Sequence, residues 1–292
     1  MKSLRYGLII IAFMACSKKN DAHKSSFDDL TKYQEYISEV SHGIISAKSD
    51  IRVVFNQSLE SWEKGDELDK DLFRIWPSTK GKVVALDKRT IAFVPETRFK
   101  QDTEYKLTLA LKEIIANVPK ELQKLTFGIR TLKQQFNVYT NPLQSYSKEH
   151  QYIEGQLRSA DQLTLDNVKK LVKATQKGKS ITIKFDETVD EGTQFHFKID
   201  SIKRYTDDSE LEVSWSGSKF DIESSGKNSI TIPGKNNFTV MGVSVDVSEN
   251  RTVLINFSDP LKRDQNFKGL VVLEGEDAPR YSTDGNTLKM YP

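Results

Sequence analysis

The sequence predicts an all-β chain of tandem β-sandwich domains, with one short helical insert in the second domain. Short runs of β-branched and aromatic residues are separated by clusters of Asp, Gly, Pro and Lys. A stretch near the end of the sequence also repeats one near its beginning, which marks tandem modules. The chain has 292 residues, 37% hydrophobic and 29% charged, which suits two domains of usual size or three small ones and excludes a disordered chain.

Residues 1–15 have the features of a lipoprotein signal peptide. Lys2 and Arg5 form a short basic region, and Tyr6–Ala15 is an apolar run too short to span a bilayer. The run ends in "FMAC", in which a small residue precedes Cys16, the only cysteine of the chain. This resembles a bacterial lipobox and predicts cleavage before Cys16 and acylation of its thiol and amino group. The alternative is an ordinary signal peptide with an accidental cysteine at the cleavage site.

Residues 16–36 are predicted to be a tether that holds the folded part away from the membrane. Ser17 follows the cysteine, in place of the aspartate that commonly retains lipoproteins at an inner membrane, so the outer membrane of a bacterial envelope is favoured. The stretch "SKKNDAHKSS" is small and polar, as a linker would be. Between residues 28 and 40 the apolar positions allow either a short helix or an extended lead-in.

The first sandwich is predicted over residues 37–134. Its strands follow one another with turn residues between them and leave hardly any helix. They are "DIRVVF", "DLFRIWP", "GKVVALD", "RTIAFVP", "TEYKLTLAL" and "KLTFGIRT".

The second sandwich is predicted over residues 135–236 and contains the helical insert, at about 164–176. The insert carries Leu165, Val168, Leu171 and Val172 on one helical face, and Gly178 would end it. The predicted strands are "FNVYT", "HQYIEGQLR", "SITIKFD", "QFHFKIDSIKRY", "ELEVSW" and "SITIPG".

An incomplete third sandwich is predicted over residues 237–292. "IRVVFNQSLE", Ile51–Glu60, matches "VLINFSDPLK", Val253–Lys262; "KDLFRIWP" corresponds to "QNFKGLVVLEG", and "KRTIAFVP" to "GNTLKMYP". Nothing after the last match corresponds to "TEYKLTLAL" and "KLTFGIRT". Because a sandwich without its closing strands has open edges, we expect these residues to be the amino-terminal part of a longer protein. Strands supplied from elsewhere are the alternative.

Motifs of catalysis, metal binding and nucleic-acid binding are missing from the sequence. The sequence has 43 Lys and Arg residues against 41 Asp and Glu residues, so its charge does not indicate a basic nucleic-acid-binding surface. It also contains no G-x-S-x-G, no phosphate loop and no HExxH. The acidic segments Gly65–Asp71 and Asp186–Gly192 lack the pattern of a calcium loop and are expected to be a solvated turn and a hairpin turn. We expect no enzyme, no cofactor and no metal site. Histidines His23, His42, His150 and His196 are scattered, and tryptophans Trp62, Trp76 and Trp215 are expected in core or inter-domain packing.

Together these features resemble the amino-terminal portion of bacterial alpha-2-macroglobulin-like lipoproteins of the Bacteroidetes type. The residues that carry the resemblance are the lipobox at Cys16, the segment from Ile51 to Pro95, "TEYKLTLAL", "TFGIRTLKQQFNV" and "VLINFSDPL". It implies Ig-like, macroglobulin-type domains in an envelope protein that traps proteases through a Cys–Gln thioester. Since Cys16 is the only cysteine, this chain carries no thioester, and no segment resembles a bait region.

Two functions from different classes follow. The first is a membrane-anchored structural arm of a macroglobulin-like protease inhibitor, whose partners would be the membrane, proteases and the rest of a longer chain, without nucleic acid. The second is an envelope lipoprotein that binds carbohydrate or protein through its sandwiches. Extensive contact between sandwiches would favour the arm, and an exposed aromatic cluster would favour the binding protein. A hydrolase with a dispersed site is a third, remote alternative.

Overall fold

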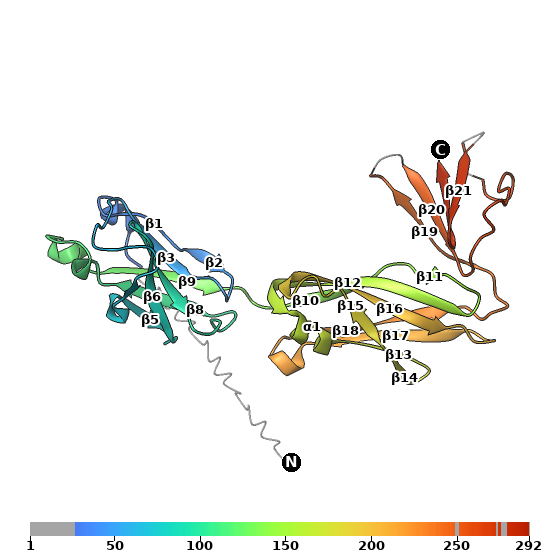
Figure 1. Cartoon of the computed structure of the whole chain (residues 1–292), viewed down its shortest axis with the longest axis horizontal. Coiled ribbons are helices and arrows are strands. Elements are labelled where there is room, and N and C mark those ends of the chain that lie inside the picture. The colour runs from blue at the N-terminus through green and yellow to red at the C-terminus, as the bar shows by residue number, and fades with distance from the viewer. Residues whose placement is uncertain (1–26, 249–250, 273, 276–278, 292) are drawn as a thin grey trace, which may run out of the picture.

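The computed structural model describes residues 27–248, 251–272, 274–275 and 279–291. These residues form three successive bodies, which we call the first module (residues 27–134), the second module (135–236) and the third module (237–291) (Figure 1). The predicted fold class is confirmed: the chain is all-β, with tandem Ig-like β-sandwiches and a short α-helix in the second module. In the described part of the chain, no helix is long and apolar enough to cross a membrane.

The first module is a sandwich of two sheets. One sheet has the order β1-β3-β7-β6-β4, with β1 Ile37–Val40, β3 Ile51–Phe55, β7 Thr90–Pro95, β6 Gly81–Asp87 and β4 Glu67–Leu68. The other has the order β2-β9-β8-β5, with β2 Gly43–Ile45, β9 Leu125–Thr131, β8 Glu104–Leu109 and β5 Phe73–Trp76. Its strands pair antiparallel except β2, which runs parallel to β9. Short 3-10 helices lie in the loops: η1 Leu30–Tyr33, η2 Lys70–Leu72, η3 Leu111–Glu113 and η4 Lys120–Leu122.

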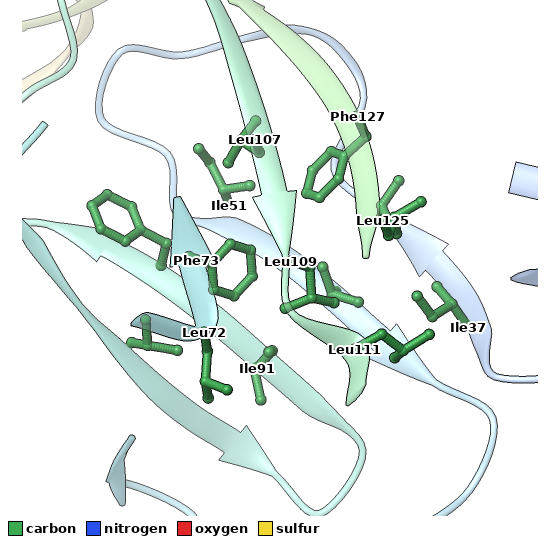
Figure 2. Packing of buried hydrophobic residues seen from close by; sticks show 14 of the residues in the cluster. Ile37, Ile51, Leu72, Phe73, Ile91, Leu107, Leu109, Leu111, Leu125 and Phe127 are labelled. Carbon is green, nitrogen blue, oxygen red and sulfur yellow. The ribbon is translucent and has the colours of Figure 1, made fainter. Parts of the chain in front are cut away.

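Alternation along the strands explains this core. In β3 the apolar residues Ile51, Val53 and Phe55 are buried while Arg52 faces solvent, as a strand with one covered face requires. Side chains of the second sheet meet them from the opposite side (Figure 2). The members contributed by β8 and β9 are Tyr105, Leu107, Leu109, Leu125, Phe127 and Ile129.

Residues 27–36 belong to the first module, so the predicted tether is wrong over this stretch. The Asp28 amide donates to the Thr126 carbonyl (2.8 Å), and the Thr126 amide donates to the Asp28 carboxylate (2.7 Å). Tyr33 is buried and its hydroxyl donates to the Lys124 carbonyl (2.6 Å). For residues 28–40 we left open a short helix or an extended segment, and the structure has one after the other: the 3-10 helix η1 and then strand β1. Cys16, the predicted lipidation residue, and the rest of the predicted tether lie outside the described residues.

The second module is also a sandwich. One sheet has the order β10-β12-β16-β15, with β10 Phe136–Thr140, β12 His150–Thr164, β16 Glu191–Lys203 and β15 Ile183–Phe185, and β11 Gln144–Ser145 pairs with β12. The other has the order β14-β13-β17-β18, with β14 Lys179–Ile181, β13 Val172–Gln176, β17 Ser209–Ser216 and β18 Ser225–Ile232. A 3-10 helix, η5 Ser218–Phe220, follows β17.

The helical insert is shorter than predicted. Helix α1 spans Leu165–Leu171, capped by the Thr164 hydroxyl, which accepts from the Asn167 amide (3.4 Å). Val172, which we expected on the helix, begins strand β13 and pairs with Trp215. From Val172 onward every second residue is buried, so sheet pairing overrides the helical spacing. The predicted strand "SITIKFD" is likewise divided between β14 and β15, which belong to different sheets.

The described residues of the third module contain one sheet, with the order β19-β20-β22-β21. Its strands are β19 Val240–Asp246, β20 Thr252–Phe257, β22 Thr287–Tyr291 and β21 Arg280–Asp284. This order matches β1-β3-β7-β6 of the first module.

The sequence repeat is also a repeat of register. In the first module Ile51 pairs with Phe93 and Val53 with Ile91. The aligned pairs in the third module are Val253 with Met290 and Ile255 with Leu288. The turns agree as well, because the amides of Phe55 and Phe257 donate to the carbonyls of the aligned residues Arg89 (2.7 Å) and Asn286 (2.9 Å). Two stretches of weak identity thus encode the same strand pair and the same loop closure.

Candidate functional site: two module junctions and an exposed sheet face

A buried aspartate holds the first module to the second. The Asp161 carboxylate, on β12, accepts from the Ser46 hydroxyl (2.5 Å) and from the Ala47 amide (2.7 Å), both in the first module. Its backbone is held by the Gln134 side chain, which donates to the Asp161 carbonyl (2.8 Å) and accepts from its amide (3.0 Å). Asp161 is only 5% exposed, so these hydrogen bonds replace the water that would otherwise solvate its carboxylate.

Charged side chains form a rim around this first junction. Glu191, at the start of β16, accepts from Lys48 and Arg98 of the first module. Lys133 of the connecting segment pairs with Glu223 (2.6 Å). These pairs join the two modules, but they are partly exposed and each contributes little to stability.

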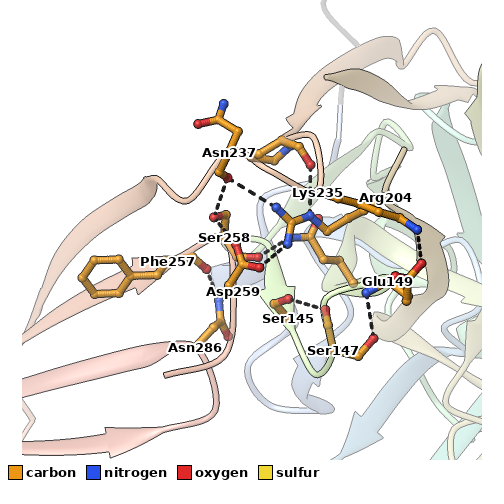
Figure 3. A network of polar contacts seen from close by, with 12 residues as sticks. Ser145, Ser147, Glu149, Arg204, Lys235, Asn237, Phe257, Ser258, Asp259 and Asn286 are labelled. Atoms are coloured by element: carbon orange, nitrogen blue, oxygen red, sulfur yellow. Dashed lines mark hydrogen bonds and ion pairs between the residues drawn. The ribbon is translucent and has the colours of Figure 1, made fainter. Parts of the chain in front are cut away.

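A buried arginine holds the third module to the second. Arg204, which follows β16, is fully buried, and its guanidinium reaches four groups (Figure 3). It donates to the carbonyls of Pro233 (3.0 Å), Gly234 (2.7 Å) and Asn237 (3.3 Å), which lie in residues 233–239, the linker between β18 and β19. It also pairs with the Asp259 carboxylate of the third module (2.6 Å). One side chain therefore fixes both the path of the linker and the start of the next sheet.

A further polar contact crosses the second junction, and others hold the adjoining part of the third module in place. Gln151 of β12 donates to the Ser258 carbonyl (2.8 Å), and the Ser258 hydroxyl accepts from the Thr239 amide (3.0 Å). Asn286 is buried and donates to the Phe257 carbonyl (2.6 Å). Its equivalent in the first module, Arg89, donates through Nε to the Phe55 carbonyl (2.9 Å), so the repeat extends to this side-chain clamp.

The outer face of the β10-β12-β16-β15 sheet carries polar and aromatic side chains. Cross-strand pairing aligns Tyr139 with Gln156 and Gln156 with His196, and it aligns Glu154 with Lys198 and Lys198 with Lys184. A shallow hollow of about 390 Å³ lies over this region. It is lined by Asn141, Glu154, Gly155, Gln156, Lys184, Phe185, Asp186, His196, Phe197 and Lys198. Both signs of charge and an imidazole thus meet at a surface large enough for a small polar ligand.

Two tyrosines form an aromatic pair beside this hollow. The rings of Tyr146 and Tyr152 stack with centroids 5.5 Å apart, and the Lys198 ammonium lies 3.8 Å from the Tyr152 centroid. The Tyr146 hydroxyl donates to Asp200 (3.0 Å). The backbone N–H of Ser201 and then this hydroxyl hold the pKa of Asp200 below its usual value. Sequence reasoning considered only the tryptophans as aromatic platforms and missed this pair, although Tyr152 occupies an outward position of a strand.

The tryptophans behave differently from one another. Trp62 packs edge-on against Phe55 (centroids 6.1 Å apart), and Trp215 lies against Gly226, as core packing predicts. Trp76 is 73% exposed at the end of edge strand β5, so its predicted packing role is wrong. Its neighbours on the strand alternate in burial, and Trp76 falls on the outward side.

The remaining predicted positions stay apart. Gly65–Asp71 contains β4 and the start of η2, where the Asp69 carboxylate caps the turn by accepting from the Asp71 amide (2.9 Å). Asp186–Gly192 closes the hairpin between β15 and β16, as predicted. Within the described ranges, no three His, Cys, Asp or Glu side chains are grouped as a metal site would need. His42, His150 and His196 lie on separate strands or loops, and His23 is outside the described residues.

Comparison with known proteins gives only distant likenesses. No protein-family model and no curated protein matches the chain. Among solved structures, the I9–I11 tandem of titin is 12% identical over 87% of each chain, with a TM-score of 0.30. The Ig1–Ig3 ectodomain of mouse nectin-like molecule 4 is 10% identical over 86% of each chain (TM-score 0.26). L,D-transpeptidase 3 from Mycobacterium tuberculosis is 12% identical (TM-score 0.22), and the match spans 40% of this chain and 44% of that one.

Proposed function

We propose that this chain is the membrane-anchored structural arm of an alpha-2-macroglobulin-like envelope lipoprotein, with no catalytic activity of its own. In this proposal Cys16 carries the lipid, the outer membrane is the site of anchoring, and the modules hold a protease-trapping apparatus away from the lipid. The thioester and the bait segment would belong to other parts of the assembled inhibitor, since Cys16 is the only cysteine here.

The observation that carries the proposal is the presence of a buried charged side chain at each module junction. A string of independent binding modules needs only flexible linkers, whereas an arm needs fixed angles between its modules. Asp161 and Arg204 are both buried among partners from two modules, and each would leave several polar groups unpaired if its junction opened. Such junctions favour a rigid arm.

Small-angle X-ray scattering of the chain without its signal peptide tests the rigidity. We expect Asp161→Ala to broaden the distance distribution, because the Ala47 amide loses its acceptor and the two modules can then adopt several relative orientations. Asp66→Ala is the matched control, since the exposed Asp66 carboxylate accepts only from the Glu63 amide (2.8 Å) in a loop of the first module. Identical profiles for the native chain and Asp161→Ala would count against a rigid arm.

Membrane anchoring is tested separately. Replacing Cys16 by Ser should move the protein from the membrane to the soluble envelope fraction, because stable anchoring requires the acylated thiol. Retention of the variant after high-salt and carbonate washes would contradict lipidation at this residue.

The assignment to a protease inhibitor needs a different experiment. The purified chain mixed with trypsin should give no adduct that survives boiling in detergent. The native lipoprotein isolated from its envelope should give one.

The exposed tyrosine pair favours a second candidate function, binding of carbohydrate or protein on the outer face of the second module. Tyr152 has one ring face covered by Tyr146 and a cation close to its ring, which leaves little open surface for a sugar to stack on. Calorimetric titration with envelope polysaccharides would test it, with Tyr139→Ala and Lys198→Ala as binding-site variants. A heat of binding that the native chain shows and both variants lose would support this binding function over the structural arm.

A further inference from the structure

The outer face of one sheet of the first module exposes several apolar side chains. Among the described residues 27–134, four large apolar side chains are exposed, and three of them, Phe27, Ile44 and Trp76, lie on the outer face of the β2-β9-β8-β5 sheet. Trp76 is 73% exposed and Ile44 is 66% exposed. Single exposed apolar residues are common on a protein surface, but three on one face of a small sheet indicate an interaction surface.

The register of the sheet places these side chains on the same side. Trp76 of β5 pairs with Lys106 of β8, which pairs with Gly128 of β9. The Phe27 ring lies over Gly128, since a β-carbon at that glycine would come within 2.1 Å of the ring. Ile44 of β2 pairs with the next outward residue of β9, two positions further along the strand. Paired residues of neighbouring strands point to one side of a sheet, so the three apolar side chains share this face.

Cationic side chains lie beside the two aromatic rings. Lys106 lies between the rings, and Arg74 precedes the tryptophan by two positions on β5 and so points to the same side. The third cation of the face, Arg130, pairs with Asp102 (2.7 Å). Glu104 is the only acidic residue in the four described strands of the sheet. The face is therefore net positive, which complements phosphate groups.

This combination of side chains suits the interface of a lipid bilayer. A tryptophan has an apolar body and a polar N–H, so it is stable at the level of the headgroups, where Lys and Arg also contact lipid phosphates. Ile44 offers no ring on which a sugar could stack, which favours lipid over polysaccharide. The chain order agrees, because Cys16 precedes Phe27 by only 11 positions, and 11 residues span at most about 40 Å.

We propose that this face of the first module rests on the membrane surface, with its three exposed apolar side chains in the headgroup region and Arg74 and Lys106 at lipid phosphates. The inference rests on the proposed anchoring at Cys16, since so small an apolar patch binds too weakly to hold the chain on a membrane alone. It adds a second contact with the bilayer, made by the folded module, and this contact fixes the orientation of the first module on the membrane.

Fluorescence quenching on vesicles tests the proposal. Residues 17–292, which contain no cysteine, are held on vesicles of phosphatidylcholine and anionic phosphatidylglycerol by an amino-terminal hexahistidine tag on a nickel-chelating lipid. A bimane dye is attached at Thr108→Cys, on the proposed face, or at Arg52→Cys, on the outer face of the opposite sheet. Spin-labelled lipid quenches the dye only at close range. We expect quenching at position 108 to be at least about threefold stronger than at position 52, because docking orients the module.

Substitutions show whether the named side chains cause this orientation. Trp76→Ala and Lys106→Glu should each lower the quenching at position 108 toward the value at position 52. Arg52→Glu, a charge reversal on the opposite sheet, is the matched control and should leave it unchanged.

Three outcomes would overturn the proposal. The first is equal quenching at the two positions, and the second is quenching at position 108 that survives both Trp76→Ala and Lys106→Glu. The third is a change in dye emission caused by soluble envelope polysaccharide and not by lipid, since a glycan would then be the occupant. The tag replaces the native anchor, so these outcomes are separate from the fractionation of Cys16→Ser, whose failure would contradict lipidation.

Discussion

The first and third modules contain the same strand pair in the same register, but among the described residues they differ in how far the neighbouring edge strand is covered. In the first module Val53 pairs with Ile91 beneath a second sheet, and both are fully buried. In the third module the aligned pair, Ile255 and Leu288, is also buried, at 8% and 0% exposed, and packs with Phe257 and Phe267. The edge strands differ, because Val40 of β1 is 3% exposed and its counterpart Val243 of β19 is 63% exposed. The comparison shows that local sequence sets strand pairing, while burial depends on strands distant in the chain.

Matched core truncations should give the largest difference between the modules. Phe55→Ala removes a ring enclosed by two sheets and should cost about 4 kcal/mol of unfolding free energy. Phe257→Ala, at the aligned position, should cost about 2 kcal/mol, because fewer atoms surround that ring. Denaturant unfolding followed by hydrogen exchange assigns each loss to its module. Equal losses would show that the third-module core is as complete as the first.

Breaking the second junction should affect the third module and spare the first. Arg204→Met leaves Asp259 and three linker carbonyls without their buried partner, which should cost about 3 kcal/mol. Limited proteolysis should then cut the linker near Gly234–Asn237 before any other site. Arg52→Met, at an exposed arginine of β3, is the control and should leave the cleavage pattern unchanged. A protease-resistant linker in Arg204→Met would refute the role assigned to Arg204.

Tyr33, in residues 27–36, should make the stability of the first module depend on pH. Burial, and then the negative charge of Asp28, raise the pKa of Tyr33 to about 12. An unfolded tyrosine titrates near pH 10, so above that pH the unfolded state loses its proton first. Stability conferred by the protonated phenol is therefore present below pH 10 and falls by up to about 2 kcal/mol as pH rises to 12.

Alkaline denaturation of Tyr33→Phe measures this contribution. The variant should be less stable at pH 8, because the Lys124 carbonyl loses a donor, and its stability should change less between pH 10 and 12. Tyr139→Phe, at an exposed position, serves as the control. Parallel pH curves for the native chain and Tyr33→Phe would exclude Tyr33 as the titrating group.

The side-chain clamps of the repeat should give the smallest effects. Arg89→Ala and Asn286→Ala each remove a bond to the carbonyl of the aligned phenylalanine and should cost about 1 kcal/mol. The loss should be larger for Asn286→Ala, because Asn286 is buried and Arg89 is exposed. Thermal unfolding of the two variants compares them directly, and a larger loss for Arg89→Ala would reverse this ranking.

Strand alternation made most of the fold predictable, and the repeat predicted the segments that form β20 and β22. The errors arose where tertiary contacts override a local pattern. Val172 fits the helical spacing of apolar residues but pairs with Trp215 in a sheet. Tyr33 follows a polar stretch, yet it is buried and donates to the Lys124 carbonyl. Sequence also failed to find the junctions, because Asp161 and Arg204 resemble surface charges until their partners from other modules are known.

The parallel pairing of β2 with β9 has a mechanical consequence. β2 lies near the point where the chain enters the first module and β9 near the point where it leaves, and Gly43, Ile44 and Ile45 pair in parallel with Ile129, Arg130 and Thr131. Once a pull between the two ends of the module has detached residues 27–36 and β1, it drags β2 and β9 in opposite directions along their length. All of their hydrogen bonds then share the load at once and do not open one by one. The first module is thus built to bear tension along the chain.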